Sequence, residues 1–306
     1  PGVERDRFSF LPFGGGPRIC IGASFALQEA AIGFLWGNGL ALAAVAPQRV
    51  AGVTALSTPA PLDAEVAARN QQLVDQWADK LHDASAETIT EWAAEHAAGR
   101  LAVTMSMENT VLAELAHRAG LDADLLFIDT GWHFPETLQV ADEVEKRYPD
   151  LPLVRVLPLL SPEEQDEVYG PRLYARDTAA YNRMRKVEPL ARALSGYEAW
   201  ATGVRREDAP TRTHTPLIGW DATHEIVKIN PLAAWTWGDV WHYIGQHQVP
   251  YNPLHDQFYP SIGCAPCTGR VAPGADPRSG RWRGSAKTEC GIHFIGGKIV
   301  RGPIAP

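Results

Sequence analysis

Cysteine is scarce in this chain: its 306 residues include four cysteines and three methionines. So few cysteines exclude a small secreted scaffold that disulfides hold together. A few thiols in a long chain instead indicate a reducing compartment, the cytoplasm, and metal or redox chemistry. The chain begins with Pro1, and no basic segment precedes a short apolar run and a small-residue cleavage site. We therefore expect a fragment or a processed product without a signal peptide.

Positive charge and long apolar runs are limited as well. The chain has 28 Lys and Arg against 36 Asp and Glu, which gives a formal net charge of −8. This balance excludes a broad nucleic-acid-binding surface but allows a local basic pocket. The long uncharged run over residues 30–48 is dominated by alanine and includes three glycines. A membrane span needs about 20 strongly apolar residues, so we expect no membrane segment.

The remaining composition is that of a folded protein with a sizeable core. Hydrophobic residues make up 45% of the chain and charged residues 21%, and both values are ordinary for globular proteins. We expect three parts, namely residues 1–32, a linker over residues 33–62 and one domain over residues 63–306. The linker carries Arg49 as its single charge and is rich in Ala, Gly and Pro.

The first part contains the sequence FGGGPRICIG at residues 13–22. It resembles the haem-binding loop of the haem-thiolate cytochrome monooxygenases, in which Cys20 would be the thiolate ligand of the haem iron. The resemblance covers only about 30 residues, and one loop with one helix cannot bury a haem. We therefore expect a remnant of a fused gene and no bound haem.

Helix and strand patterns alternate through the third part. An amphipathic helix opens it, with Val66, Leu73, Trp77 and Leu81 on one face. A second helix begins after Ser85 and ends at Gly99. Strands are then expected over residues 101–105, 125–128, 153–157, 198–203 and 226–229, and helices over residues 109–119 and 135–148. This alternation predicts an α/β fold with a doubly wound, mainly parallel sheet and helices on both faces.

Polar residues follow the first two expected strands. Ser106 comes directly after the first strand, and Asp129, Thr130 and Gly131 follow the second. Parallel strands present their carboxyl ends at one edge of a sheet, where ligands bind. A strand followed by a helix also offers free N–H groups to an anion. The sequence therefore predicts an anion site at this edge, although the first turn lacks the glycines of a phosphate loop.

Several long motifs occur in one order over residues 64–296. They are FIDTGWHFPETL (127–138), RKVEPL (185–190), WATGVRREDAPTR (200–212), VKINPLAAWTWGDVWHYI (227–244), VPYNPLHDQFYPSIGCAPCTGRV (249–271) and GRWRGSAKTECGIHF (280–294). This set resembles the assimilatory adenylyl-sulfate and phosphoadenylyl-sulfate reductases. The resemblance implies an adenine-nucleotide alpha-hydrolase-like fold. It also implies reduction of an activated sulfate to sulfite with thioredoxin, or glutaredoxin, as partner.

Cys290, within KTECGIH, suits the role of catalytic nucleophile. Its thiolate would attack the sulfate sulfur and form an S-sulfocysteine, and thioredoxin would then release sulfite. A nucleophilic thiolate needs positive neighbours that lower its pKa. Four basic residues precede Cys290 within 12 positions, namely Arg278, Arg281, Arg283 and Lys287.

The resemblance also implies a binding site for the nucleotide and its sulfate. Lys186, Arg278 and Arg281 would hold the sulfate and the adjoining phosphate, since arginine matches such oxyanions in a bidentate manner. A second basic group, Arg205, Arg206 and Arg212, is expected to bind the nucleotide phosphates. The tryptophan-rich segment over residues 235–241 is expected to pack in the core from a helix.

One departure from the family concerns the metal. Members that use adenylyl sulfate hold a 4Fe-4S cluster with four cysteines, of which Cys264 and Cys267 are present here. Tyr181 and Asn182 stand in place of the other pair, as in the cluster-free reductases of phosphoadenylyl sulfate. The resemblance places this pair, at a helix end, beside Cys264 and Cys267.

Three interpretations stay open for these residues. The chain is an active reductase without a cluster, binds a metal between two such cysteine pairs in a homo-oligomer, or is a weakened paralogue. We expect adenylyl sulfate as the substrate because more of the chain matches that group, whereas Tyr181 and Asn182 favour the alternative, phosphoadenylyl sulfate. A nucleotide-binding module that adenylates its substrate would need a glycine-rich loop, and the turn at residues 106–109 lacks one.

Overall fold

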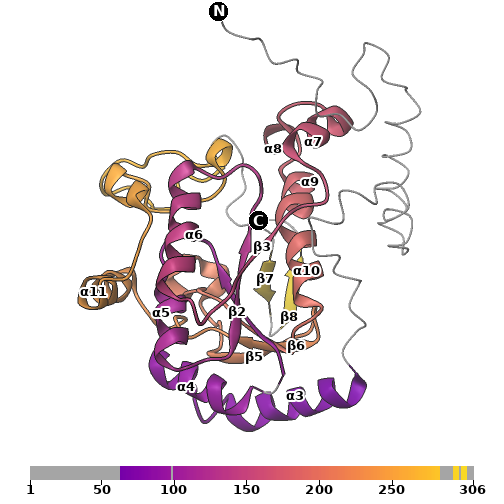
Figure 1. Cartoon of the computed structure of the whole chain (residues 1–306), viewed down its shortest axis with the longest axis vertical. Helices are drawn as coiled ribbons and strands as arrows, with labels where there is room; N and C mark the ends of the chain where they lie inside the picture. The colour runs from indigo at the N-terminus through magenta and orange to yellow at the C-terminus, as the bar shows by residue number, and fades with distance from the viewer. Residues whose placement is uncertain (1–62, 98, 283–291, 296–297, 302–306) are drawn as a thin grey trace, which may run out of the picture.

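The computed structural model describes residues 63–97, 99–282, 292–295 and 298–301, with side chains up to Trp282 (Figure 1). The expected remnant over residues 1–32, the expected linker over residues 33–62 and the predicted nucleophile Cys290 lie outside the described residues. Among the helices that the structure describes, none is both long and apolar enough to cross a membrane.

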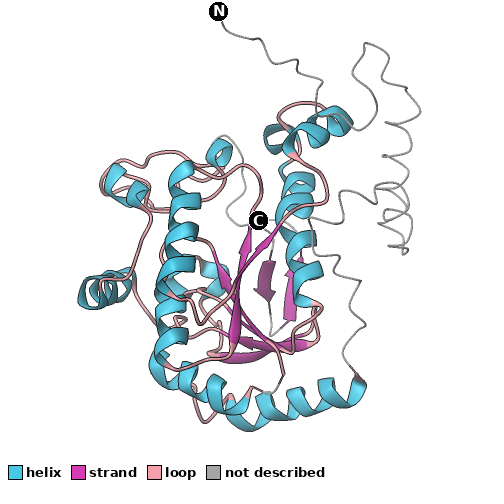
Figure 2. Cartoon of the chain, viewed as in Figure 1, coloured by secondary structure: helices cyan, strands magenta, loops and turns pink. Residues whose placement is uncertain are grey.

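A six-stranded sheet forms the centre of the described chain (Figure 2). Its strands are β1 (Leu101–Met105), β2 (Ala123–Ile128), β3 (Leu153–Val156), β4 (Ala199–Ala201), β5 (Ile218–Asp221) and β6 (Ile226–Ile229). They lie in the order β3-β2-β1-β4-β6-β5, and all neighbours are parallel except β5, which is antiparallel to β6. The chain runs outward from β1 to β3 and then returns to the other side of β1. The order thus reverses between β1 and β4, the position at which such sheets bind ligands.

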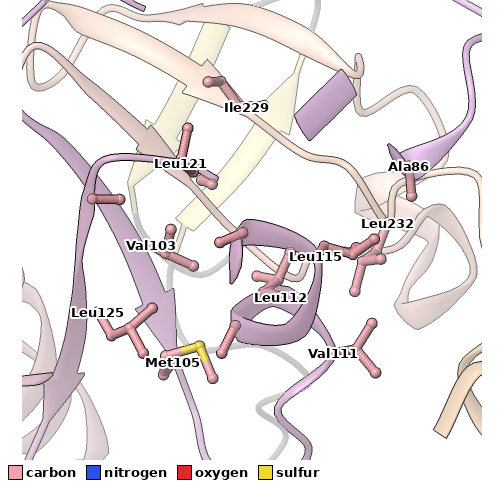
Figure 3. Close-up of a cluster of buried hydrophobic side chains, with 14 of the residues drawn as sticks. Ala86, Val103, Met105, Val111, Leu112, Leu115, Leu121, Leu125, Ile229 and Leu232 are labelled. Carbon is pink, nitrogen blue, oxygen red and sulfur yellow. The ribbon is translucent and has the colours of Figure 1, made fainter. Parts of the chain in front are cut away.

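One face of the sheet packs against most of the helices. These are α3 (Ala64–Trp77), α4 (Ala86–His96), α5 (Val111–Arg118), α6 (Pro135–Arg147) and α11 (Trp237–His247). Figure 3 shows Val103 and Met105 of β1 gathered with Leu112 and Leu115 of α5. Successive strand residues point to opposite faces, and Val103, Met105 and Leu125 all belong to this cluster. This layer is the larger part of the hydrophobic core.

The other face of the sheet packs against α10 (Glu188–Leu194). Leu194 of this helix is fully buried and clusters with Ala102, Leu126 and Trp200 of the strands. Since both faces carry helices, the expectation of a doubly wound, mainly parallel α/β sheet is confirmed.

The long connection from β3 to α10 is almost entirely helical. It consists of α7 (Pro162–Tyr169), α8 (Leu173–Arg176), α9 (Thr178–Asn182) and the π-helical turn η1 (Arg183–Val187). A capping box of Ser161 and Glu164 begins α7, and Gly170, with a φ of 74°, ends it. Single π turns inside helices are frequent at functional sites.

Short elements complete the described chain. Four 3₁₀ turns lie in the connections, namely η2 (Arg206–Asp208), η3 (Pro210–Arg212), η4 (Pro253–Gln257) and η5 (Ala265–Cys267). A separate two-stranded hairpin consists of β7 (Ile292–Ile295) and β8 (Lys298–Arg301).

The expected strands are all present, with ends that differ by a few residues. In α3 the most buried residues are Asn70 and Val74, whereas the predicted Leu73 and Trp77 are partly buried against the core. The tryptophan-rich segment packs against the core as expected, because Trp235, Trp237 and Trp241 all contact the larger cluster. The edge strand β5, the helices from α7 to α9 and the hairpin were not predicted from the sequence.

Candidate active site

Four segments meet beyond the carboxyl ends of β1 and β2: residues 106–109, 129–134, 261–267 and 278–282. Main-chain contacts connect them, since Ala265 N–H donates to the Trp132 carbonyl at 2.7 Å and Trp282 N–H donates to the Cys267 carbonyl at 2.9 Å. We call this convergence the strand-exit site. It lies beside the point where the strand order reverses, so its position is that of a ligand site in an α/β sheet.

Glu108 and Arg281 hold two of these segments together. Oε1 of Glu108 accepts a hydrogen bond from Ile262 N–H at 2.6 Å and lies 3.7 Å from Nη1 of Arg281. The same Nη1 donates to the Ser261 hydroxyl at 3.0 Å and to the Ile262 carbonyl at 2.9 Å. Arg281 is 9% exposed. Its position is therefore fixed before any ligand binds.

The two arginines predicted to bind the sulfate share one aromatic ring. The guanidinium carbon of Arg281 lies 4.8 Å from the ring centroid of Trp282, and that of Arg278 lies 5.9 Å from the same centroid. Nε of Arg278 is buried without a hydrogen-bond partner in the described part of the chain. The structure thus brings Arg278 and Arg281 together at the strand-exit site, with donor capacity left for an oxyanion.

The loop after β2, residues 129–134, has a conformation that its own sequence requires. The Asp129 carboxylate accepts a hydrogen bond from Gly131 N–H at 2.9 Å, a turn that aspartate favours. Gly131 has a φ of 73°, and a Cβ atom there would lie 2.8 Å from Cγ of Pro162. Both the positive φ and this close approach favour glycine. Ser106, at the end of the adjacent β1, is exposed to solvent.

Thr130 and His133 of this loop are turned into the protein. Thr130 is 1% exposed, and its hydroxyl lies 3.3 Å from Sγ of Cys264. Nε2 of His133 lies 3.0 Å from the Ile128 carbonyl oxygen and 3.2 Å from the amide nitrogen of Thr130. Burial lowers the pKa of His133, and the charge of Lys186 lowers it further against the attraction of Asp129. A neutral imidazole therefore lies close to Lys186, which is half-buried on η1.

The second basic group follows β4 and already has acidic partners. Arg205 forms ion pairs with Glu207 and Asp208, both at 2.7 Å, and its guanidinium lies 4.6 Å from the centroid of Trp237. Arg206 donates to the Thr215 carbonyl at 2.9 Å. Nη1 of Arg212 lies 3.1 Å from the Asp208 carboxylate. A phosphate bound to this group would compete with the two carboxylates.

His255 connects the second basic group to the strand-exit site. It donates from Nε2 to the Glu108 carbonyl at 3.1 Å. Its ring centroid lies 5.5 Å from that of Trp237, the ring that Arg205 covers. Burial lowers the pKa of His255, although the nearby Glu108 opposes this. The imidazole of His255 is therefore neutral where it lies between the second basic group and the strand-exit site.

Cys264 and Cys267 are buried beside the end of α9. Cys264 is 1% exposed and Cys267 9%, and both pack with Tyr181, Leu173 and Trp282 in one cluster, which we call the thiol core. The expectation that this helix end lies beside the two cysteines is confirmed. Burial is the main cause that raises the pKa of Tyr181, and the adjacent Cys264 adds to it.

The thiol core does not fit a 4Fe-4S cluster. Such a cluster takes four thiolate ligands, whereas the positions beside Cys264 and Cys267 carry the phenol of Tyr181 and the amide of Asn182. Within residues 63–97 and 99–282, no three His, Cys, Asp or Glu side chains are grouped so that they could hold a metal ion. Both side-chain amide atoms of Asn182 are buried without hydrogen-bond partners in the described chain.

Sequence reasoning missed three residues of this region, Glu108, His255 and Arg185. Glu108 lies in the turn after β1 and could have been included with Ser106. His255 and Arg185 lie inside the motifs quoted above, but the amino-acid sequence does not indicate that both side chains are buried.

Two surface hollows of about 270 Å³ each lie elsewhere, and both include Glu87 of α4. One is lined by Leu115 and Arg118 at the end of α5, and the other by Asp239 and His242 of α11. The end of α5 leads into the start of β2, so the first hollow is at the opposite edge of the sheet from the strand-exit site. None of the residues predicted to bind substrate lines either hollow.

Comparison with known proteins gives one long match and one short match. Residues 100–270 match the family model described as phosphoadenosine phosphosulfate reductase domain, and residues 2–36 match the one described as cytochrome P450. An adenosine 5'-phosphosulfate reductase of Mycolicibacterium smegmatis is 50% identical over 223 residues, which are 73% of this chain and 94% of that protein. A phosphoadenosine 5'-phosphosulfate reductase of Gloeobacter violaceus is 50% identical over 195 residues, 63% of this chain and 81% of that protein.

A solved structure agrees with these relatives. The crystal structure of phosphoadenylyl-sulfate reductase from Candida auris, in a phosphate complex, has a TM-score of 0.57 and 31% sequence identity. The match covers 66% of this chain and 97% of that one.

Proposed function

The chain belongs to the phosphoadenosine phosphosulfate reductase domain family, and on that premise we propose that its own substrate is adenylyl sulfate. It is an oxidoreductase that reduces a phosphosulfate nucleotide in sulfate assimilation. The products of the proposed reaction are sulfite and AMP. The proposal covers the choice of nucleotide, the residues that carry the reaction and the reductant.

The observation that carries the proposal is the pair of arginines on Trp282. Arg278 and Arg281 lie over one indole ring, at the strand exits where the strand order reverses. A sulfate joined to a phosphate carries its negative charge on adjacent oxyanions, which two neighbouring guanidinium groups match. Lys186 adds a third cation on the side of the loop after β2.

Cys290 is the proposed nucleophile. Its thiolate attacks the sulfate sulfur, the bond from that sulfur to the phosphate oxygen breaks, and AMP leaves. The enzyme then carries an S-sulfocysteine. A thiolate of reduced thioredoxin, or of glutaredoxin, attacks Sγ of this adduct and displaces sulfite, and the second thiol of the reductant resolves the mixed disulfide. The two electrons that sulfite gains come from the dithiol, which leaves as a disulfide.

No iron-sulfur cluster takes part in this proposal. Cys264 and Cys267 of the thiol core provide half of the thiolates that such a cluster needs, and Tyr181 and Asn182 provide none. Among the described residues, Arg278, Arg281 and Lys186 are the cations that we assign to the sulfate. Because the reaction uses reduced thiols, we also propose that the chain works in the cytoplasm.

Phosphoadenylyl sulfate is the alternative substrate. Tyr181 and Asn182 favour it, because they replace the cysteine pair that the resemblance associates with adenylyl sulfate. A weakened paralogue is the other alternative, because the buried amide atoms of Asn182 lack hydrogen-bond partners in the described chain.

Sulfite release from the two nucleotides tests the proposal. Purified full-length chain would be incubated with reduced thioredoxin and either adenylyl sulfate or phosphoadenylyl sulfate, with oxidised thioredoxin as the control. We expect a higher kcat/KM with adenylyl sulfate. A preference for the 3'-phosphorylated nucleotide would support the first alternative, and the absence of sulfite with both would contradict the function.

A further inference from the structure

Arg185 is a fully buried arginine whose donors reach two loops and one helix of the molecule. It is 0% exposed and comes from the π turn η1. Its Nε donates to Oε1 of Gln165 at 2.7 Å, and Nη2 donates to the Ser161 carbonyl at 2.8 Å. Nη1 donates to the Leu160 carbonyl at 2.7 Å and, more weakly, to the Thr130 carbonyl at 3.4 Å.

These contacts join the loop after β2 to the loop after β3. Thr130 belongs to the first loop, and Leu160 and Ser161 end the second. The two loops also approach each other where Gly131 faces the ring of Pro162. One guanidinium therefore fixes both sides of this contact, close to the strand-exit site.

The charge of Arg185 is costly at this position. Its four acceptors are three main-chain carbonyls and one amide oxygen, all of them neutral. Burial lowers the pKa of Arg185, and the nearby Tyr181 and Cys264 oppose this. A buried cation held by neutral acceptors is a weak source of stability. The planar, five-donor guanidinium nevertheless holds several carbonyls at fixed angles, which an apolar side chain cannot do.

The next residue, Lys186, acts on the same loop through its charge. Lys186 is half-buried, and its charge acts on His133 of the loop after β2. Arg185 therefore contacts this loop directly through the Thr130 carbonyl, and the charge of the next residue, Lys186, acts on the loop electrostatically. The extra residue in a π turn changes which way its side chains face.

We propose that Arg185 is a positioning residue, which fixes the loop over residues 129–134 and the adjacent Lys186 in the arrangement that binds the sulfate of the nucleotide. This rests on the proposed function. A binding group that is misplaced by about 1 Å can lower the rate on the order of 100-fold. A residue that acts in this way affects the binding of substrate more than the chemical step.

The test compares substitutions of Arg185 in the full-length chain. Arg185→Met removes all the hydrogen-bond donors of the side chain. Arg185→Lys keeps the positive charge but loses the planar guanidinium group. We expect Arg185→Met to lower kcat/KM for adenylyl sulfate on the order of 100-fold, mainly through KM. Arg185→Lys should raise KM at least about 10-fold, with kcat within about two-fold of wild type.

Arg192 provides the matched control, because it is half-buried and donates to the Leu157 carbonyl in the same second loop. Arg192→Lys should leave KM unchanged. If Arg185→Met fails to fold, Arg185→Lys decides, and a KM equal to that of wild type in this variant overturns the proposal.

Hydrogen exchange separates this inference from the proposed function. Amides of residues 129–134 should exchange faster in Arg185→Lys than in wild type, and not in Arg192→Lys. Wild-type protein that releases no sulfite contradicts the function, and the exchange rates then decide on the positioning. Equal exchange in wild type and Arg185→Lys overturns the positioning role.

Discussion

At the scale of single residues, the loop after β2 depends on a glycine that no other residue can replace without strain. Gly131 has a φ of 73°, and an added Cβ would overlap the ring of Pro162. The loop carries Asp129 and Thr130, so strain at Gly131 would be transmitted to the predicted substrate contacts.

We predict that Gly131→Ala weakens the binding of adenylyl sulfate by at least about 10-fold, because the loop must move away from Pro162. Gly120→Ala is the matched control. Gly120 has a φ of 63° but open space around its Cβ position, so the substitution should cost about 1 kcal/mol of stability and no affinity. Isothermal titration calorimetry with adenylyl sulfate measures the affinity of both variants. Equal affinities of Gly131→Ala and wild type would show that the loop does not contact the nucleotide.

Lys228 is a buried cation on β6, 5% exposed, with its ammonium 4.6 Å from the ring centroid of Trp200. Burial lowers the pKa of Lys228 from 10.5 to about 8, although the nearby Asp221 opposes this. Between about pH 8 and pH 10.5 the unfolded chain therefore holds a proton here that the folded chain has lost. Since the unfolded state binds more protons, the contribution of Lys228 to stability rises with pH through this window.

We predict that Lys228→Met changes the pH dependence of unfolding. The free energy of unfolding of the variant minus that of wild type should fall by about 3 kcal/mol between pH 7 and pH 11. Tyrosines that titrate in this range are present in both proteins and cancel. Urea titrations at several pH values measure the difference, with Lys146→Met as the control because Lys146 is exposed. A difference that is constant with pH would mean that Lys228 stays charged in the folded state.

At the scale of elements, the end of α9 and the turn η5 form one unit. Tyr181 ends up against Cys264 and Cys267 in the thiol core, and the adjacent Asn182 is 2% exposed. The two elements are more than 80 positions apart in sequence, yet they bring the residue types of a half-complete metal site together.

We predict that the double variant Tyr181→Cys, Asn182→Cys completes a four-thiolate site. After anaerobic reconstitution with iron and sulfide, the variant should bind about four irons per chain, and wild type should bind little. The single variants serve as controls with three thiolates. Iron analysis and the absorption spectrum measure the outcome. Stoichiometric iron in wild type would show that two chains share a site, each with its Cys264 and Cys267.

Elements of the sheet differ in how far the sequence predicts them. The strands β1 and β2 are mainly apolar and are followed by polar residues, so their places and the position of the site were predictable. The edge strand β5 has four residues, among them Gly219, and exists because it pairs with β6. Arg185 and Lys186 are adjacent basic residues in the sequence. Which of the two is buried depends on the π turn, in which Arg185 is the buried one.

At the scale of the whole molecule, the described residues contain a large hydrophobic core. The first described helix begins after Asp63, which caps it through Glu65 N–H. The family match covers residues 100–270, whereas the cytochrome P450 match covers residues 2–36. The two matches therefore concern separate parts of the chain.

We predict that deletion of residues 1–62 leaves sulfite release unchanged and shifts the melting temperature by at most a few degrees, because the described residues from Val74 to Val249 already form a large core cluster. Differential scanning calorimetry and the sulfite assay measure this on both proteins. Loss of the folding transition on deletion would place part of the first 62 residues in the core.

The central claim is that Cys290 attacks the sulfate of the nucleotide, and mass spectrometry of the protein tests it most directly. The reduced full-length chain would be incubated with adenylyl sulfate in the absence of thioredoxin and then digested. The account predicts one added sulfonate group, on the peptide that contains Cys290, which disappears when reduced thioredoxin is added. In Cys290→Ser the adduct should be absent and the nucleotide still bound. A sulfonate on Cys264 or Cys267, or sulfite release by Cys290→Ser, would contradict the account.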